Sequence, residues 1–329
     1  MARLHVLEMQ PTQSALWALG RRGAMVGLVA LLVALVVAPR PALLVLWNVA
    51  VPLLPASFFI APALWRGICP LSTLNAWGNR LGTPRDLTSR ETTWLAVGGL
   101  LLFQAMVPAR HLSFNTDGTA LVITIAAVGA IAVMCGARFT SRSAFCNALC
   151  PVLPVERLYG QAPLVQITRG RCDTCNVCTP SGCIDLADRK AMRQVLGAPR
   201  HGTAWLRTPF GWFATALPGF IAAYGLLPDT HGSDPLPIYA ATLKGSLTSH
   251  LVARLLIGFT AMPPARSVCL LAALSGALYY WFAAPVIVAA LALPLPLATL
   301  LRVPAFALIA AWTTRTLRQD PRHDAAGIR

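Results

Sequence analysis

Long runs of apolar residues recur along this chain and constrain its fold more than any other feature. In the first half they cover residues 23–38, 41–64, 94–107 and 120–135. A helix that crosses a bilayer needs roughly 20 apolar residues, because every backbone N–H and C=O must be satisfied inside the segment. Buried helices of a large soluble protein could mimic one such run, but not the whole series. The sequence therefore predicts an all-α integral membrane protein.

The distribution of charge predicts how the chain is oriented in the membrane. Only 12% of the residues are charged, against about a quarter in soluble domains, yet the net charge is +15. Arg and Lys gather in residues 66–93, 138–208 and the tail from 313, whereas loops 109–118 and 228–236 hold few. Basic loops alternating with non-basic loops are typical of cytoplasmic and external sides. The charge therefore predicts topology and lipid contact, and argues against nucleic acid as a partner.

The apolar runs predict about eight membrane-spanning helices, within a range of six to eight, with both termini in the cytoplasm. The expected spans cover residues 22–38, 42–64, 94–108, 119–137, 209–227, 237–260, 267–284 and 285–301. They divide the chain into three regions. Residues 1–137 form an N-terminal membrane region of two hairpins with a cytoplasmic loop at 66–93. Residues 138–208 form a cytoplasmic, cysteine-rich iron–sulfur segment, and residues 209–329 form a C-terminal membrane region.

The nine cysteines fall into two groups according to their surroundings. Cys135 and Cys269 lie in apolar runs, where a thiol acts as a small core residue. The other seven lie in the basic loops 66–93 and 138–208. Because these loops are expected in the reducing cytoplasm, metal or redox chemistry is favoured there over disulfides.

The strongest motif is a C-x2-C-x2-C run at Cys172, Cys175 and Cys178, followed by Cys183. Two-residue gaps let one short loop bring three thiolates to an iron–sulfur cube, as ferredoxin-type loops do. The last gap is four residues, and Ile184 follows Cys183 in place of proline, so the fourth ligand stays open. Zinc sites usually combine separated cysteine pairs or Cys with His, which makes zinc the weaker alternative. The run therefore predicts a 4Fe-4S cluster.

A second cysteine pattern appears where each of the first two hairpins returns to the cytoplasm. The first exit reads Cys69-Pro70, and the second reads Cys146-x3-Cys150-Pro151. When the two are aligned on Cys-Pro, Trp65 stands opposite Cys146, which indicates a duplicated unit whose first copy kept one cysteine. Cysteines four residues apart share one face of a helix. We therefore expect Cys69, Cys146 and Cys150 to be candidate ligands of a second cluster.

The combination of Cys-Pro hairpin exits and a ferredoxin-like cysteine run resembles the membrane-bound polyferredoxin proteins of the NosR and NapH type. The resemblance covers about residues 40–190. It rests on Cys69-Pro70, Cys146, Cys150-Pro151, Cys172, Cys175, Cys178 and Cys183. It implies 4Fe-4S centres that pass electrons between the quinone pool or a cytoplasmic donor and a redox partner protein. It also implies a multi-pass protein of the bacterial inner membrane whose iron–sulfur loop faces the cytoplasm. The chain departs from this pattern in having Trp65 in place of a cysteine and a single ferredoxin-type run.

Charged residues inside an expected span are functional candidates because they are costly there. Lys244, His250 and Arg254 lie in or beside the span 237–260, and the last two are one helical turn apart. We expect His250 and Arg254 to hold the headgroup of a quinone. Haem is a weaker alternative, since a lone histidine supplies one axial ligand. The structural alternative is a tilted helix whose basic side chains reach the lipid headgroups.

These patterns predict a membrane-bound iron–sulfur protein that transfers electrons, acting as a component of an oxidoreductase system and not as a stand-alone enzyme. The alternative is a non-enzymatic membrane accessory, maturation or redox-sensing factor with a structural cluster or zinc. The sequence leaves open the partner, the direction of electron flow and whether a second cluster is present.

Overall fold

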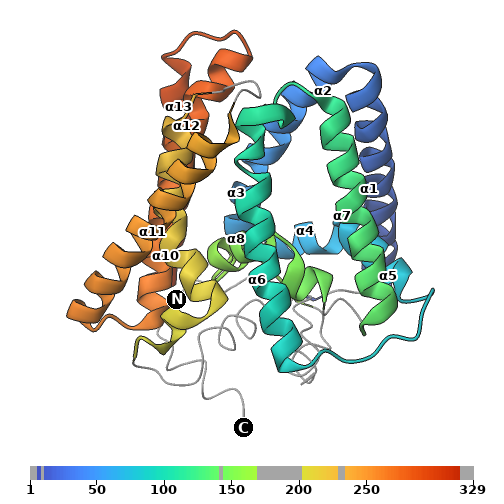
Figure 1. The fold of residues 1–329 in the computed structure, drawn as a ribbon, viewed down its shortest axis with the longest axis horizontal. Helices are drawn as coiled ribbons and strands as arrows, with labels where there is room; N and C mark the ends of the chain where they lie inside the picture. Colours follow the sequence, from blue (N-terminus) through green and yellow to red (C-terminus); the bar gives the residue numbers. More distant parts are fainter. Residues whose placement is uncertain (1–5, 9–10, 141–143, 169–201, 229–233, 319–329) are drawn as a thin grey trace.

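The computed structural model describes residues 6–8, 11–140, 144–168, 202–228 and 234–318. Within these residues the protein is a bundle of long helices with short helices packed between them (Figure 1). The long helices are α1 (Pro11–Val37), α6 (Ser89–Met106), α7 (Gly118–Arg138), α10 (Pro209–Leu226), α11 (Pro235–Thr260), α12 (Pro264–Ala290) and α13 (Leu297–Arg318). One more long segment is continuous through α2 (Pro39–Val45), the π-helix η1 (Leu46–Ala50) and α3 (Val51–Ile60).

The shorter elements connect these helices. They are α4 (Pro62–Ile68), α5 (Pro70–Gly78), the π-helices η2 (Arg110–Phe114) and η3 (Phe145–Leu149), α8 (Leu153–Tyr159) and the 3-10 helix η4 (Ala204–Arg207). The described strands, β1 (Val6–Glu8) and β2 (Gln166–Thr168), form a small parallel pair with Val6 opposite Gln166. The expected all-α architecture is therefore correct except for this pair.

Six helical segments are long and apolar enough to cross a membrane. They are Ala15–Val37, Pro39–Ile60, Ser89–Phe114, Gly118–Arg138, Pro264–Ala290 and Leu297–Arg318. This finding confirms the prediction of a helical, multi-pass membrane protein. Helices α10 and α11 are not among the six, although they pack beside α12 and α6 respectively. The count of eight spans, the identity of the membrane and the side of each loop stay predictions.

The two spans expected near the C-terminus are placed differently in the structure. The expected boundary at Pro285 was wrong, because α12 runs through this proline without a break. Arg302, which directly follows the expected span 285–301, lies inside α13. The two helices form a hairpin whose turn is at residues 291–296, and they pack along each other (Figure 1).

Helix α12 continues through Pro285 because a neighbouring helix satisfies the carbonyl that this proline leaves without a donor. Proline has no N–H, so the carbonyl of Trp281, four residues earlier, loses its helical hydrogen bond. Arg302 of α13 donates to that oxygen from Nε at 3.2 Å and from Nη2 at 2.7 Å. The guanidinium also lies 4.1 Å from the centre of the Trp281 ring.

The first half of the chain consists of two helical hairpins, each followed by two short helices. Helices α4 and α5 follow the hairpin of α1 and α3, while η3 and α8 follow the hairpin of α6 and α7. Helix α5, which follows the first hairpin, packs on α7 of the second. Helix α8, which follows the second hairpin, packs on α3 of the first. At the α5–α7 contact a Cβ on Gly136 would overlap the carbonyl oxygen of Asn75. Because α5 and α8 follow the two Cys-Pro turns directly, this packing places both turns between the hairpins.

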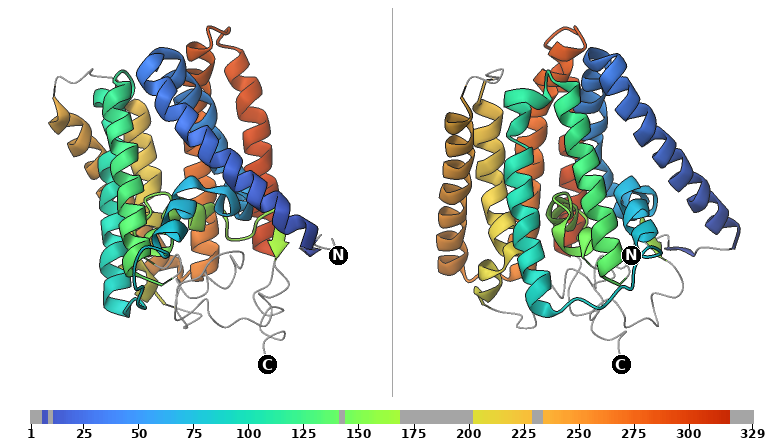
Figure 2. Two further views of the ribbon diagram at one scale, coloured as in Figure 1. Left: turned by 90° about the vertical axis from the view of Figure 1, so that its right-hand side faces the viewer. Right: turned by 45° about the vertical axis from the view of Figure 1, so that its right-hand side comes forward.

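The largest buried cluster joins these short helices to the C-terminal half. Phe59 of α3 stacks on Tyr159 of α8 with ring centres 4.6 Å apart, and Trp312 of α13 packs edge-on against Phe59 at 4.9 Å. Arg315 of α13 donates to the Leu164 carbonyl at 2.8 Å. The C-terminal helix α13 therefore contacts the segment 144–168. The N-terminal strand β1 lies at the same segment, because it pairs with β2. Helix α1 leans away from the bundle (Figure 2).

Candidate metal centre and quinone site

The cysteine run that carries the main cluster prediction, Cys172, Cys175, Cys178 and Cys183, lies outside the described residues. The 4Fe-4S cluster predicted there stays a prediction. The structure describes the three other candidate ligands, Cys69, Cys146 and Cys150. It also describes the two cysteines expected in the core, of which Cys269 is fully buried and Cys135 is partly buried against an apolar cluster.

Cys69 and Cys150 occupy the same kind of turn. Each ends a helix and precedes a proline, with φ and ψ of −52° and 124° at Cys69 and of −60° and 121° at Cys150. A residue before proline is disfavoured in the helical region, and both cysteines adopt an extended conformation at which the helix ends. The matching backbone is the one expected if the two hairpin exits are copies of one unit.

The helices that lead into these turns differ in their winding. The Cys69 N–H donates to the carbonyl of Trp65, four residues earlier, whereas the Cys150 N–H donates to that of Phe145, five residues earlier, both at 2.8 Å. The second copy is thus a π-helical turn, and it contains Cys146. Single π-turns are frequent at functional sites. Cys146 is partly buried and packs in the apolar cluster formed by α7 and Phe145.

The sulfur of Cys150 lies near the backbone N–H groups of Val152 and Leu153. They lower its pKa, but burial outweighs them. The Leu153 N–H itself donates to the Cys150 carbonyl at 3.2 Å. Burial first, and the nearby Cys69 next, raise the pKa of the Cys150 thiol to about 12. The metal-free thiol is therefore protonated at neutral pH, and a metal has to displace that proton. Backbone N–H groups directed at a sulfur are one of the means by which proteins tune iron–sulfur clusters.

Three charged side chains lie near the two turns. Arg66 of α4 and Glu156 of α8 form an ion pair with Nε and Oε1 2.5 Å apart, and their side chains are only 10% and 7% exposed. Arg157 of α8 donates from Nη2 to the Asn147 carbonyl of η3 at 3.2 Å. Burial first, and Arg66 next, lower the pKa of Arg157 to about 10. Its guanidinium is still protonated at neutral pH, so two cations and one carboxylate share this interior.

The described cysteines do not make a complete metal site by themselves. Within the parts of the chain that the structure describes, no group of three or more His, Cys, Asp or Glu side chains is arranged to hold a metal ion. Cys69, Cys146 and Cys150 are therefore not gathered like the ligands of a finished cluster. A second cluster at these residues depends on cysteines outside the described residues.

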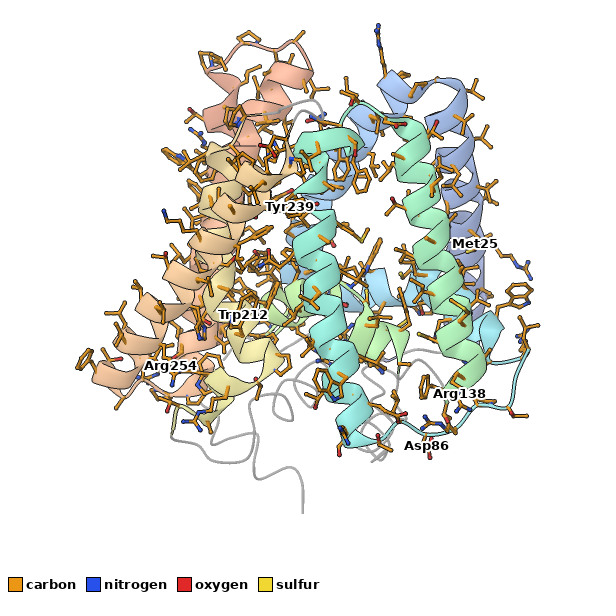
Figure 3. The ribbon with its side chains drawn as sticks, viewed as in Figure 1. Met25, Asp86, Arg138, Trp212, Tyr239 and Arg254 are labelled. Atoms are coloured by element: carbon orange, nitrogen blue, oxygen red, sulfur yellow. The ribbon has the colours of Figure 1, made fainter. Side chains whose placement is uncertain are left out.

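The predicted quinone residues lie on α11 but do not share one pocket. His250 is partly buried and faces α10, where its Nδ1 lies 2.7 Å from the Thr215 hydroxyl oxygen. Its ring centre is 6.4 Å from that of Trp212. Arg254 is exposed one turn further along α11 (Figure 3). Lys244 is exposed as well. The structure thus separates His250, which contacts the bundle, from the two basic residues that point outward.

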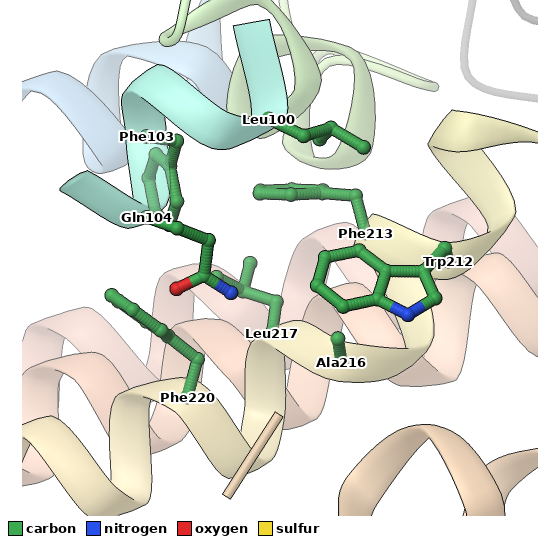
Figure 4. Close-up of a pocket in the computed structure, with 8 residues that line it drawn as sticks. All are labelled: Leu100, Phe103, Gln104, Trp212, Phe213, Ala216, Leu217 and Phe220. Carbon is green, nitrogen blue, oxygen red and sulfur yellow. The ribbon is translucent and has the colours of Figure 1, made fainter. Parts of the chain in front are cut away.

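A small cleft lies between α6 and α10 (Figure 4). Its walls are mostly apolar and aromatic, made by Leu100, Phe103, Gln104, Trp212, Phe213, Ala216, Leu217 and Phe220. Its free space is only about 10 Å³, far below the roughly 300–1,000 Å³ of drug-sized ligand sites. Gln104 donates from Nε2 to the Ser246 hydroxyl at 3.1 Å. Sequence reasoning missed Gln104, although a lone amide in the apolar run 94–107 was a signal.

No family model matches this chain, and no curated protein or solved structure matches it either.

Proposed function

We propose that this protein is a membrane-bound iron–sulfur protein that transfers electrons between a quinone pool or a cytoplasmic donor and a redox partner protein. The observation that carries the proposal is the run Cys172, Cys175 and Cys178 in a chain with six helices able to cross a membrane. Three thiolates at two-residue gaps suit a 4Fe-4S cluster, which accepts and releases one electron. Cys183 or a more distant cysteine would complete the set.

The described residues support this proposal through the Cys150 turn. Two backbone N–H groups lie near its sulfur, and Cys69 lies close by in a turn of the same shape. We therefore propose that Cys69, Cys146 and Cys150 contribute to a second cluster, as the resemblance to polyferredoxin proteins implies.

For the quinone, we propose the region where the cleft between α6 and α10 meets His250. The Gln104 amide and the His250 imidazole are polar groups there, and a quinone carbonyl needs donors of this kind. Trp212 forms a wall of the cleft and also faces the His250 ring. Arg254, at the exposed surface, would meet a lipid headgroup or the entrance of the site.

The proposal further places the protein in a bacterial inner membrane, with its cysteine-rich loop in the cytoplasm. It makes the chain one component of an oxidoreductase system. The competing function is a non-enzymatic accessory, maturation or redox-sensing factor whose cluster, or zinc, only stabilises a loop. That function needs the same cysteines but no electron acceptor.

Anaerobic purification followed by metal analysis and EPR tests the proposal. We expect iron and acid-labile sulfide in the wild type, and a dithionite-induced EPR signal that a quinone analogue or a redox partner abolishes. Cys175→Ser is expected to lose that signal. The matched control Cys135→Ser, in α7, is expected to keep it.

Two outcomes contradict electron transfer. A colourless protein that contains zinc instead of iron supports a structural scaffold. An iron protein whose reduced cluster is oxidised by neither a quinone analogue nor any redox partner supports the accessory role.

A further inference from the structure

Lys244 of α11 is an exposed cation at the depth of the membrane interior. Its depth follows from α6, which belongs to the candidate span Ser89–Phe114. Gln104 lies 15 residues after the start of this span and ten before its end, and it donates to Ser246 of α11 at 3.1 Å. Lys244 is two residues from Ser246, about 3 Å along the helix axis. The lysine is therefore level with the middle of the span.

Contacts with the neighbouring helices fix which face of α11 points outward. A Cβ on Gly219 of α10 would lie 2.1 Å from the Gly245 carbonyl oxygen, so the two backbones touch at the residue next to Lys244. On the α6 side, the Tyr239 hydroxyl donates to the Ala105 carbonyl at 2.8 Å. Helix α11 lies at the outside of the bundle (Figure 2). A rotation that buried Lys244 would break both contacts.

A cation at this depth is costly in a bilayer, and membrane proteins turn such residues to the bundle interior or pair them. Lys244 is exposed, and none of the described residues forms an ion pair or a hydrogen bond with its ammonium. Lysines near helix ends reach the lipid headgroups with their long side chains. The headgroups begin about 15 Å from the centre of the hydrocarbon core, farther than one lysine side chain extends. The position therefore calls for an anionic group inside the membrane.

The surface around Lys244 suits a second helix. Its exposed neighbours one and two turns away are Ala240, Leu247, Thr248 and Leu251, and the two leucines are 46% and 59% exposed. Residues three and four apart lie on one face of a helix. Small residues let helices approach closely in membranes, and polar groups bond across the contact. A helix that packed on this strip and carried a carboxylate would pair with the lysine.

A second copy of this chain offers no such carboxylate. Of its twelve Asp and Glu residues, only Glu91 falls within the bounds of a candidate span. Glu91 is two residues from the start of that span, and it is already paired with Arg85. We infer that the strip around Lys244 binds a transmembrane helix of a different protein, one that carries Asp or Glu near the middle of the membrane. This interface is independent of the iron–sulfur proposal, because it needs no cluster.

The test measures binding of a model helix to the full-length protein in vesicles of neutral phosphatidylcholine. The probe is a labelled transmembrane peptide of leucines with one central Glu, and the matched peptide has Leu in its place. We expect energy transfer from labelled protein to show at least tenfold tighter binding of the Glu peptide. Lys244→Met is expected to remove this preference, and Lys244→Arg to keep it. Lys244→Glu is expected to prefer a peptide with a central Lys instead.

Arg266→Met, which removes an exposed cation at the start of α12, is the matched control and is expected to keep the preference for Glu. Equal binding of both peptides by the wild type, or an unchanged preference in Lys244→Met, overturns the inference. So does self-association of the wild type that Lys244→Met abolishes, which would assign the strip to a second copy. Loss of co-purified phosphatidylglycerol in Lys244→Met, with no peptide preference in the wild type, would assign the lysine to lipid headgroups and also overturn it.

Discussion

Arg66 and Glu156 form a buried ion pair that joins the two segments in which Cys69 and Cys150 lie. Arg66 lies three residues before Cys69, Glu156 lies six residues after Cys150, and Nε and Oε1 are 2.5 Å apart. Both side chains are largely shielded from water, so neither charge is screened as on a surface. The pair fixes how α4 and α8 lie against each other, and with them the two cysteine turns.

Breaking this pair on one side is expected to destabilise the protein. Arg66→Met removes the cation that pairs with the buried Glu156 carboxylate, and breaking such a pair typically costs about 3–5 kcal/mol. The double variant Arg66→Met, Glu156→Leu replaces both charges with apolar groups and is expected to recover most of that loss. Thermal unfolding of the detergent-solubilised protein measures both. A double variant as unstable as the single one would show that the pair does more than compensate charge.

Pro285 and Arg302 are expected to be coupled through the Trp281 carbonyl. Arg302→Leu removes both donors to that oxygen and is expected to cost about 1–3 kcal/mol. In a Pro285→Ala background, the backbone N–H at position 285 can donate to the Trp281 carbonyl in place of Arg302. Arg302→Leu should then cost much less. A double-mutant cycle of unfolding free energies gives the coupling, expected to lie between about 0.5 and 3 kcal/mol. A coupling of zero would contradict our explanation of the unbroken α12.

The Cys150 thiol is expected to resist alkylation in the iron-free protein. Its pKa is raised from 9.0 to about 12, chiefly by burial, so it stays protonated at pH 10, where an exposed thiol is mostly ionised. A raised pKa means that the fold favours the neutral thiol. Its contribution to stability is complete below about pH 9 and is lost as the pH rises toward about 12.

Iodoacetamide labelling from pH 7 to 10, followed by peptide mass spectrometry, measures this reactivity. A small-molecule thiol serves as the reference for ionisation. Labelling of Cys150 that rises between pH 8 and 9 like the reference would contradict the burial described here. We also expect iron loading of the iron-free protein to release protons and to become more favourable as the pH rises.

His250 is expected to affect the reaction with quinone. His250→Ala removes the imidazole beside Thr215 and is expected to slow reoxidation of the reduced protein by a quinone analogue about tenfold, equal to 1.4 kcal/mol. Gln104→Leu is expected to act in the same direction by removing the amide in the cleft. Exposed Lys244→Ala, six residues earlier on α11, is the control. Stopped-flow absorbance measures the rates, and equal rates in all three variants would place the quinone elsewhere.

The sequence by itself determined the class of the protein. Apolar runs near bilayer length leave no alternative to helices that satisfy their own backbone, and the structure confirms six of them. It also located the Cys-Pro turns, because proline disfavours the helical conformation of the residue before it. The cysteine run at Cys172 to Cys178 determined the expected chemistry, and it lies outside the described residues.

Only the tertiary structure decided which residues meet across the sequence. Pro285 marked a helix end from the sequence, yet α12 continues because Arg302, 17 residues later, supplies the missing donors. Arg66 and Glu156 are 90 residues apart, and no local pattern links them. The side-chain donors Asn147 Nδ2 and Arg157 Nε are buried without an acceptor, and this too is a result of the tertiary structure. A sequence shows periodicity and spacing, but burial and long-range pairing depend on tertiary packing, here that of α5 on α7 and of α8 on α3.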